Sequence, residues 1–254
     1  MIAAPPERNR LEARLAAVAG LAATPVLRAR LDRAGPLALR ALEAAPDSES
    51  FAALLDVLSV PETRMFRAAP QLEALAECAL RGRDRLTLVS AGCATGEEAW
   101  TLAILAAQRA TNWRVEGIDL SRPAIAAAEA ATYHLGPPDA LREVPPAARA
   151  SLVVAGQEFS PAPALRPRVR FRRANLLDPG LPAAAADAIL CRNVLIYMTE
   201  AARQQVLARL LAALAPRGVL VLGATDRPDP SLGLVAWRGG ALGLWHRAGE
   251  RPDG

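Results

Sequence analysis

One stretch, residues 87–105 (TLVSAGCATGEEAWTLAIL), constrains the fold of this chain more than any other. It begins with the short, partly β-branched run 87–89, which is typical of a buried strand end. Small residues follow from 90 to 96, and Glu97 then opens a segment whose apolar residues recur at helical spacing. A strand, a small-residue turn and a helix in this order predict the first βα unit of a nucleotide-binding α/β fold, with the ligand on the turn.

The spacing of the glycines in this stretch does not fix the ligand. Gly92 and Gly96 form G-x-x-x-G rather than the G-x-G-x-x-G of dinucleotide-binding folds. An ordinary tight turn without a ligand is therefore an alternative for this stretch taken alone. A second strand is expected at 113–120, and Asp119 near its end is the residue type that accepts hydrogen bonds from two vicinal ribose hydroxyls.

Composition argues against several other classes of protein. Hydrophobic residues make up 52% of the 254 residues, but charges interrupt every run, so we expect no transmembrane helix. The N-terminus lacks the apolar core of a signal peptide, and a cytoplasmic protein is expected. Three cysteines without a C-x-x-C pair and only two histidines argue against a disulfide framework and a metal site. The net charge of +4 comes from arginines without lysines and is spread out, so it does not by itself predict a nucleic-acid partner.

The rest of the chain alternates between helical and strand-like patterns. Residues 1–78 are expected to form an N-terminal helical domain and a linker, and 79–254 the main domain, with a proline-rich insertion at about 136–170. Apolar strands are expected from 186 and at 218–225, and Arg238-Gly239-Gly240 between two apolar runs indicates a closing hairpin. These patterns predict an α/β fold with a mostly parallel, Rossmann-like sheet and a C-terminal β-hairpin, preceded by a small all-α N-terminal domain.

Three separated segments resemble one family. VPETRMFR (60–67) is similar to N-E-T-x-F-F-R, SAGCATGEE (90–98) to S-A-G-C-S-T-G-E-E, and ILCRNVLIYM (189–198) to I-x-C-R-N-V-L-I-Y-F. These are hallmarks of the CheR-type chemotaxis-receptor protein-glutamate O-methyltransferases. NLLD (175–178) and LLAALAPRGVLVLGATD (210–226) fall in the same order as in that family. The resemblance runs from about residue 26 to the C-terminus.

The resemblance implies a class I methyltransferase sheet that binds S-adenosyl-L-methionine. It implies that Glu97 takes the methionine ammonium and Asp119 the ribose, and that Arg67 and Tyr197 stand at the transferred methyl as catalytic residues. The cofactor-binding residues that it implies are Thr63, Arg67, Gly92, Glu97, Asp119, Asn175, Leu176, Cys191 and Arg192. Structural alternatives are a helix-end acid for Glu97, a core aromatic for Tyr197 and an interdomain salt bridge for Arg67.

The implied reaction is methyl transfer to glutamate side chains on the cytoplasmic helical domain of a chemoreceptor or a similar signalling protein, carried out by a monomer. A glutamate carboxylate is ionised at neutral pH, since its unperturbed pKa is about 4.3, and needs alignment and desolvation rather than a strong base.

Two alternatives stay open. The departures at Pro61, Met65 and Ala94 indicate, as one alternative, a degenerate relative that binds the cofactor or a partner without catalysis. The pI of 9.6 indicates a second alternative, a nucleic-acid methyltransferase. The segment CRNVLIY stands where base-amine enzymes carry (D/N)-P-P-(Y/F/W), which argues against the latter. Because Arg67 and Tyr197 are both present, an active enzyme is favoured.

Overall fold

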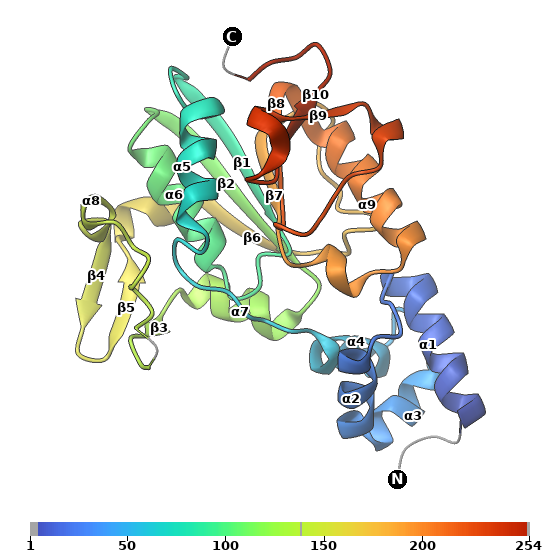
Figure 1. Ribbon diagram of the computed structural model, residues 1–254. Helices are drawn as coiled ribbons and strands as arrows, with labels where there is room; N and C mark the ends of the chain where they lie inside the picture. Colours follow the sequence, from blue (N-terminus) through green and yellow to red (C-terminus); the bar gives the residue numbers. More distant parts are fainter. Residues whose placement is uncertain (1–4, 138, 253–254) are drawn as a thin grey trace.

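The computed structural model describes residues 5–137 and 139–252, and it is organised around one twisted sheet with helices on both faces (Figure 1). The strands of this sheet lie in the order β6-β2-β1-β7-β8-β10-β9. The first five are parallel, β10 runs antiparallel to β8, and β9 runs antiparallel to β10. The strands are β1 (Arg85–Ala91), β2 (Asn112–Asp119), β6 (Val169–Arg173), β7 (Ala186–Cys191), β8 (Leu214–Leu222), β9 (Leu234–Ala236) and β10 (Leu244–Arg247).

This topology confirms the predicted Rossmann-like sheet with a C-terminal hairpin preceded by helices. The helices are α1 (Pro5–Ala19), α2 (Pro25–Ala34), α3 (Pro36–Glu43), α4 (Glu49–Leu58), α5 (Ala69–Cys78), α6 (Glu97–Ala107), α7 (Arg122–Ala130), α8 (Pro146–Arg149) and α9 (Glu200–Ala213). Short 3-10 turns are η1 (Pro163–Arg168), η2 (Leu195–Tyr197), η3 (Pro230–Leu232) and η4 (Trp237–Gly240), the last forming the bend between β9 and β10.

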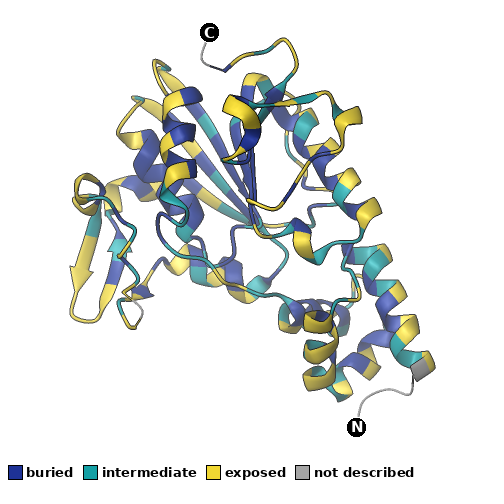
Figure 2. Ribbon diagram, viewed as in Figure 1, coloured by how far each residue is buried: buried dark blue, intermediate teal, exposed yellow. Residues whose placement is uncertain are grey.

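Alternating side chains of the strands supply two separate cores. Leu88 of β1 packs with α5 and α6, whereas the adjacent Val89 packs with α9 on the opposite face. The central strands are therefore buried on both sides, as the dark blue ribbons in Figure 2 show. The carboxyl ends of the parallel strands form one edge of this sheet, and ligands of open α/β sheets bind at that edge.

The turn between β1 and α6 requires its two glycines. Gly92 has φ +83°, and a Cβ there would lie 2.3 Å from Cγ2 of Val194. Gly96 has φ +95°, and a Cβ there would lie 2.7 Å from that of Ala128. The G-x-x-x-G spacing thus serves close packing of the turn against α7 and against residues 192–194, which follow β7 and are called the β7 tip below.

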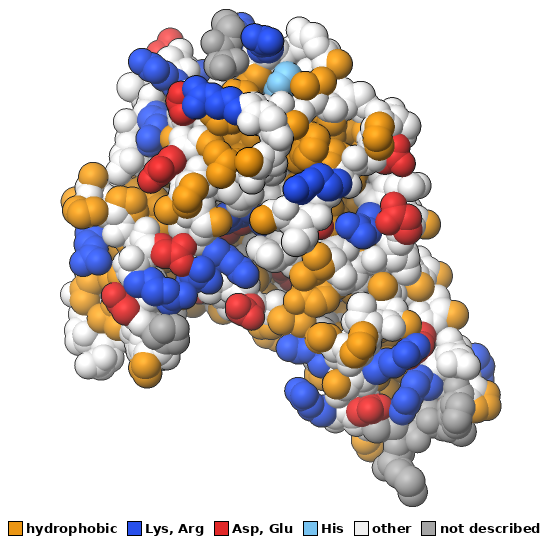
Figure 3. Space-filling view, viewed as in Figure 1, with side chains coloured by type: hydrophobic (Ala, Val, Ile, Leu, Met, Phe, Trp, Pro, Cys, Tyr) orange, Lys and Arg blue, Asp and Glu red, His pale blue; other side chains and the backbone are white. Residues whose placement is uncertain are grey.

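The N-terminal helices α1–α4 have a core of their own, built on Leu15, Leu31, Phe51 and Leu54. They are joined to the sheet by more than the linker, because Leu21 forms an isolated antiparallel bridge with Met198. On the face seen in Figure 3, the surface is hollowed between these helices and the rest of the molecule, and charged side chains of both signs gather around the hollow.

The proline-rich region and the residues just before it form a small separate sheet. Its strands β3 (Tyr133–His134), β4 (Leu152–Ala155) and β5 (Glu158–Pro161) are antiparallel, in the order β3-β5-β4. In Figure 1 this sheet stands to the left of the central one. Within the described ranges, no helix has both the length and the apolar character needed to cross a membrane.

Candidate active site

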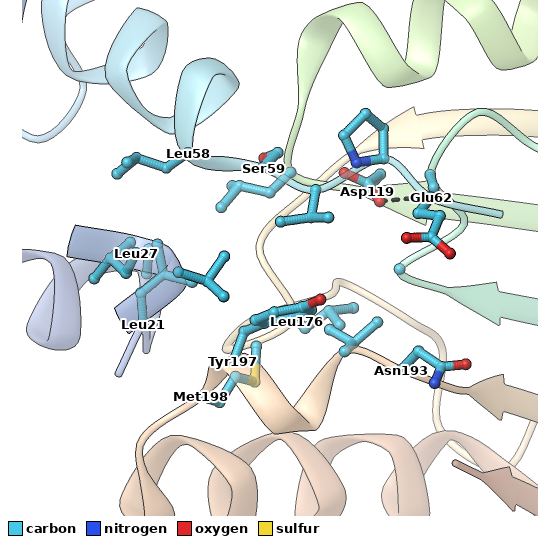
Figure 4. A pocket seen from close by; sticks show the side chains of 18 of the residues that line it. Leu21, Leu27, Leu58, Ser59, Glu62, Asp119, Leu176, Asn193, Tyr197 and Met198 are labelled. Atoms are coloured by element: carbon cyan, nitrogen blue, oxygen red, sulfur yellow. Dashed lines mark hydrogen bonds between the residues drawn. The ribbon is translucent and has the colours of Figure 1, made fainter. Parts of the chain in front are cut away.

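A pocket lies at the carboxyl edge of the central sheet, between that edge, the N-terminal helices and the linker that follows α4 (Figure 4). In the close-up, Leu21 and Leu27 border one side, Asp119 and Glu62 lie across from them, and Tyr197 reaches into the space between. Of the predicted site residues, the pocket brings together Gly92, Asp119, Asn175, Leu176, Arg192 and Tyr197.

Asp119 stands at the end of β2 with its carboxyl group fixed by the backbone. Oδ2 accepts a hydrogen bond from the Ala94 N–H at 2.9 Å, and Oδ1 accepts one from the Ser121 N–H at 2.9 Å. Burial raises the pKa of Asp119 despite these hydrogen bonds. Each carboxylate oxygen keeps further acceptor capacity, so the group suits a ligand that offers two hydroxyl donors.

Asn175 and Leu176 follow β6 and line the floor of the pocket. The Asn175 amide donates to the Val18 carbonyl at 2.7 Å, and its oxygen accepts from the Leu177 N–H at 3.0 Å. The side chain thus ties the loop after β6 to the end of α1. Leu176 is buried and offers an apolar contact there.

Tyr197 is held through its backbone by the segment between α1 and α2. Its carbonyl accepts from the Ala22 N–H at 2.8 Å, and the Thr199 N–H donates to the Gly20 carbonyl at 2.8 Å. The pocket side of η2 is therefore fixed by the N-terminal helices rather than by the sheet alone.

Arg192 both lines the pocket and anchors the structure beneath it. Its Nε donates to Glu98 Oε2 at 2.7 Å, and one terminal nitrogen donates to the Arg67 carbonyl at 2.7 Å and to Gln71 Oε1 at 3.1 Å. Ser90 donates to the other Glu98 oxygen at 2.6 Å. The guanidinium therefore joins the β7 tip, the first turn of α6 and the linker.

Glu97, in contrast, is directed elsewhere. Its carboxyl accepts from the Thr95 hydroxyl at 2.7 Å, and burial raises its pKa. Glu97 is not among the residues that line the pocket, nor are Thr63 and Arg67. The Arg67 guanidinium donates to the Glu62 carbonyl at 3.3 Å, within the linker itself.

Cys191 is likewise not part of the pocket surface. It is completely buried in the core beneath, among residues packed on α9. Cys93, in the glycine turn, is also buried. Burial raises the pKa of both thiols. Their small side chains serve packing in this structure, and among the described residues no cluster of three or more His, Cys, Asp or Glu side chains could hold a metal ion.

Several pocket residues were not predicted from the sequence. They come from the linker and the N-terminal helices, which periodicity describes only as helix faces, and from the β7 tip: Leu21, Ala22, Thr24, Val26, Leu27, Ser59, Val60, Glu62, Asn193 and Met198. Of these, Val60, Glu62, Asn193 and Met198 belong to the segments that resemble the family, whereas the others carried no signal.

The parallel sheet with a C-terminal antiparallel hairpin, together with an acid at the end of β2 above a glycine turn, defines a class I methyltransferase fold. Residues 61–231, which are 171 of the 254, match the family described as CheR methyltransferase, SAM binding domain. The chain therefore belongs to the CheR methyltransferase family and is an S-adenosylmethionine-dependent methyltransferase.

Similar proteins carry related names. Chemotaxis protein methyltransferase 1 of Pseudomonas aeruginosa is 30% identical over 193 residues, covering 68% of this chain and 68% of that protein. The probable biofilm formation methyltransferase WspC of the same species is 31% identical over 189 residues, covering 68% of this chain and 43% of that protein, so the match spans less than half of WspC. Among solved structures, the Bacillus YcgJ protein has 14% identity and a TM-score of 0.42, covering 65% of this chain and 55% of that one.

The pocket residues fit S-adenosylmethionine by their chemistry. Asp119 has two oxygens with spare acceptor capacity for ribose hydroxyls. Leu120 and Leu176 offer apolar contacts for a purine ring, and the close packing of the Gly92 turn leaves its backbone facing the pocket. The cofactor lacks a pyrophosphate, so a turn without lysine is sufficient.

Proposed function

We propose that this chain esterifies glutamate side chains on the cytoplasmic helical domain of a chemoreceptor or a related signalling protein, acting in the cytoplasm as a monomer. The observation that supports it most is the family match over 61–231, which includes the linker, the glycine turn and the β7 tip that meet around one pocket. When bound, S-adenosylmethionine supplies a methyl group on a sulfonium sulfur.

At the cofactor end, we assign the ribose to Asp119 and the adenine surroundings to Asn175 and Leu176. Asp119 is held by two backbone N–H groups, so its orientation is set before the ligand arrives. Gly92 allows close approach of the backbone, while Cys191 supports the pocket from below.

The ammonium of the methionine moiety needs a carboxylate, and two adjacent glutamates are available. The family resemblance assigns it to Glu97, whose buried carboxyl has one side-chain hydrogen-bond partner, Thr95. Glu98 is the acid that is joined directly to the pocket residue Arg192. Separate substitution of the two residues distinguishes them.

At the acceptor end, the chain's task is to orient and desolvate a carboxylate that is already ionised. Tyr197 reaches into the pocket, and its hydroxyl is a suitable donor to one carboxylate oxygen, leaving the other free to attack. Arg67 and Thr63 lie on the linker beside the pocket, and the planar Arg67 guanidinium is suited to hold an acceptor carboxylate.

A second candidate function is cofactor or partner binding without catalysis. The observation in its favour is Pro61, which lines the pocket where the family carries an asparagine side chain. Turnover decides between the two. Methyl transfer to a receptor domain, reduced at least tenfold by Tyr197→Phe with unchanged S-adenosylhomocysteine affinity, supports the enzyme. Calorimetric binding of S-adenosylhomocysteine without methyl transfer to any receptor domain supports the binding protein.

A further inference from the structure

The linker that carries Arg67 has an unusual backbone. Phe66 and Ala68, on either side of Arg67, both adopt left-handed conformations, with φ of 56° and 61°. Such conformations are costly for residues other than glycine and persist only where the surroundings hold them. Something outside the linker must therefore keep Arg67 where it is.

Side chains from three different parts of the fold form hydrogen bonds with the backbone of three consecutive linker residues. The Phe66 N–H donates to Thr101 Oγ1 of α6 at 3.0 Å. The Arg67 carbonyl accepts from Arg192 at the β7 tip at 2.7 Å. The Ala68 N–H donates to Glu143 Oε2 at 2.9 Å. Two of these contacts come from the methyltransferase sheet and its first helix, but the third does not.

Glu143 belongs to the inserted region, in the segment between β3 and α8, and is 75 positions away from Ala68. Its other oxygen accepts from Arg64 Nε at 2.6 Å. One carboxylate thus binds the linker on both sides of Arg67, at positions 64 and 68. Partial burial opposes ionisation of this group, but hydrogen bonds from Arg64 and Ala68 and the charges of Arg64 and Arg142 lower the pKa of Glu143 overall.

We propose that Glu143 is a positioning residue: the inserted region uses it to hold the Arg67 linker in its strained conformation, so that methyl transfer depends on the insert. Its carboxylate binds the linker, lies 3.9 Å from the neighbouring Arg142, and acts on the reaction through Arg67. The kinetic part of this inference rests on the proposed function, whereas its structural part does not.

The test compares four variants of the full chain. Glu143→Ala removes both contacts. Arg64→Ala removes the ion pair but leaves the Ala68 hydrogen bond. Glu143→Gln keeps an acceptor oxygen for the Ala68 N–H. Glu158→Ala is the matched control, because Glu158 lies on β5 of the same insert and its side chain is half exposed. Its one ionic contact within the described part of the chain is with His134, at 3.8 Å.

The first readout is hydrogen exchange of the peptide spanning 64–71, followed by mass spectrometry. We expect Glu143→Ala to speed exchange there by about tenfold or more, since a hydrogen bond to a charged group is lost. Arg64→Ala and Glu143→Gln should show less than a third of that effect on a logarithmic scale, and Glu158→Ala none. Unchanged exchange in both Glu143 variants would overturn the proposal.

The second readout is methyl transfer to a receptor domain. We expect Glu143→Ala to lower kcat by about tenfold while the Kd for S-adenosylhomocysteine changes less than threefold, with substantial rescue in Glu143→Gln. Equal losses in Arg64→Ala and Glu143→Ala would mean that the ion pair only stabilises the fold, which contradicts a positioning role. If the wild-type chain methylates no receptor, the proposed function fails, but the exchange experiment still decides whether Glu143 holds the linker. If Glu143→Ala does not fold, exchange at 64–71 in Glu143→Gln must be faster than in Glu158→Ala, and equal exchange in these two variants would overturn the proposal.

Discussion

Nε of Arg192 lies 2.7 Å from Oε2 of Glu98, and the two side chains are only 5% and 9% exposed. The pair joins the tip of β7 to the first turn of α6 directly behind the pocket wall. Ser90 also donates a hydrogen bond to Glu98. The Arg192 guanidinium also donates to the Arg67 carbonyl and to the Gln71 side-chain oxygen. Removing one partner of such a pair leaves a buried charge without compensation.

Glu98→Ala should therefore destabilise the fold by about 3–5 kcal/mol. Urea unfolding monitored by circular dichroism measures this directly. Glu98→Gln, which keeps an oxygen for the Arg192 Nε donor, should cost markedly less. An unfolding midpoint for Glu98→Ala equal to that of the wild type would show that the pair does not support the structure.

Glu97→Ala should behave in the opposite way. Its carboxyl has one side-chain partner, Thr95, and burial disfavours its ionised form in the absence of a cation. We expect the fold to be retained and S-adenosylhomocysteine to bind at least about tenfold more weakly, as for loss of a charge-assisted hydrogen bond. Calorimetry checks this, with Glu116→Ala as the control, because Glu116 lies on β2, pairs with Arg172 and does not line the pocket. If Glu97→Ala binds S-adenosylhomocysteine as tightly as the wild type, the ammonium is bound by another acidic residue.

Cofactor binding should weaken on acidification. Burial raises the pKa of Asp119 above its usual value of about 3.9, so its carboxylate is protonated earlier as the pH falls. Two ribose hydroxyls need both carboxylate oxygens as acceptors, so the affinity for S-adenosylhomocysteine should fall at pH values below that raised pKa. The Asp119→Asn variant should bind S-adenosylhomocysteine weakly, and its affinity should change less with pH.

The stability of the ligand-free protein should follow the reverse trend. The folded state holds the Asp119 proton more tightly than the unfolded state, so this group's contribution to the unfolding free energy is present below the ordinary pKa and is lost as pH rises through the raised one. The difference in unfolding free energy between the wild type and Asp119→Asn, measured as a function of pH, isolates this contribution. A difference between the two that grows in the wild type's favour with rising pH would contradict the assignment.

Gly20→Ala should loosen the contact between the N-terminal helices and Tyr197. Gly20 has φ +70°, and a Cβ there would lie 2.7 Å from that of Ala202. Strain and overlap together should cost about 2–4 kcal/mol of unfolding free energy and reduce turnover. Gly136→Ala is the control, because a Cβ there meets nothing within 4 Å. Equal stability of both variants would argue against tight docking of this segment.

Much of the fold could be predicted because its signals are local. The small-residue turn before Glu97 and the apolar strands depend on a few neighbouring residues, and the structure contains each of them. The last parallel strand was expected at 218–225 but begins at Leu214. The pairing of β8 with β7 shifts its register between Ala186 and Ala188, and with this irregularity the strand includes the residues from Leu214 to Arg217.

Less of the site could be predicted from the sequence, because the site depends on contacts between residues far apart in the chain. The position at a strand end identified Asp119, and motif resemblance identified Tyr197, and both residues line one pocket. It could not show that Cys191 faces the core, that Glu97 turns to Thr95, or that Glu143 reaches the linker. Those outcomes depend on side-chain direction and tertiary packing, which no spacing rule encodes.

Methyl transfer from labelled S-adenosylmethionine to purified cytoplasmic domains of the host's chemoreceptors tests the central claim most directly. We predict label on glutamate side chains, released as methanol by mild alkali because the product is an ester, and strongly reduced in Tyr197→Phe. A chain that binds S-adenosylhomocysteine but transfers no alkali-labile methyl to any of these domains would contradict the account.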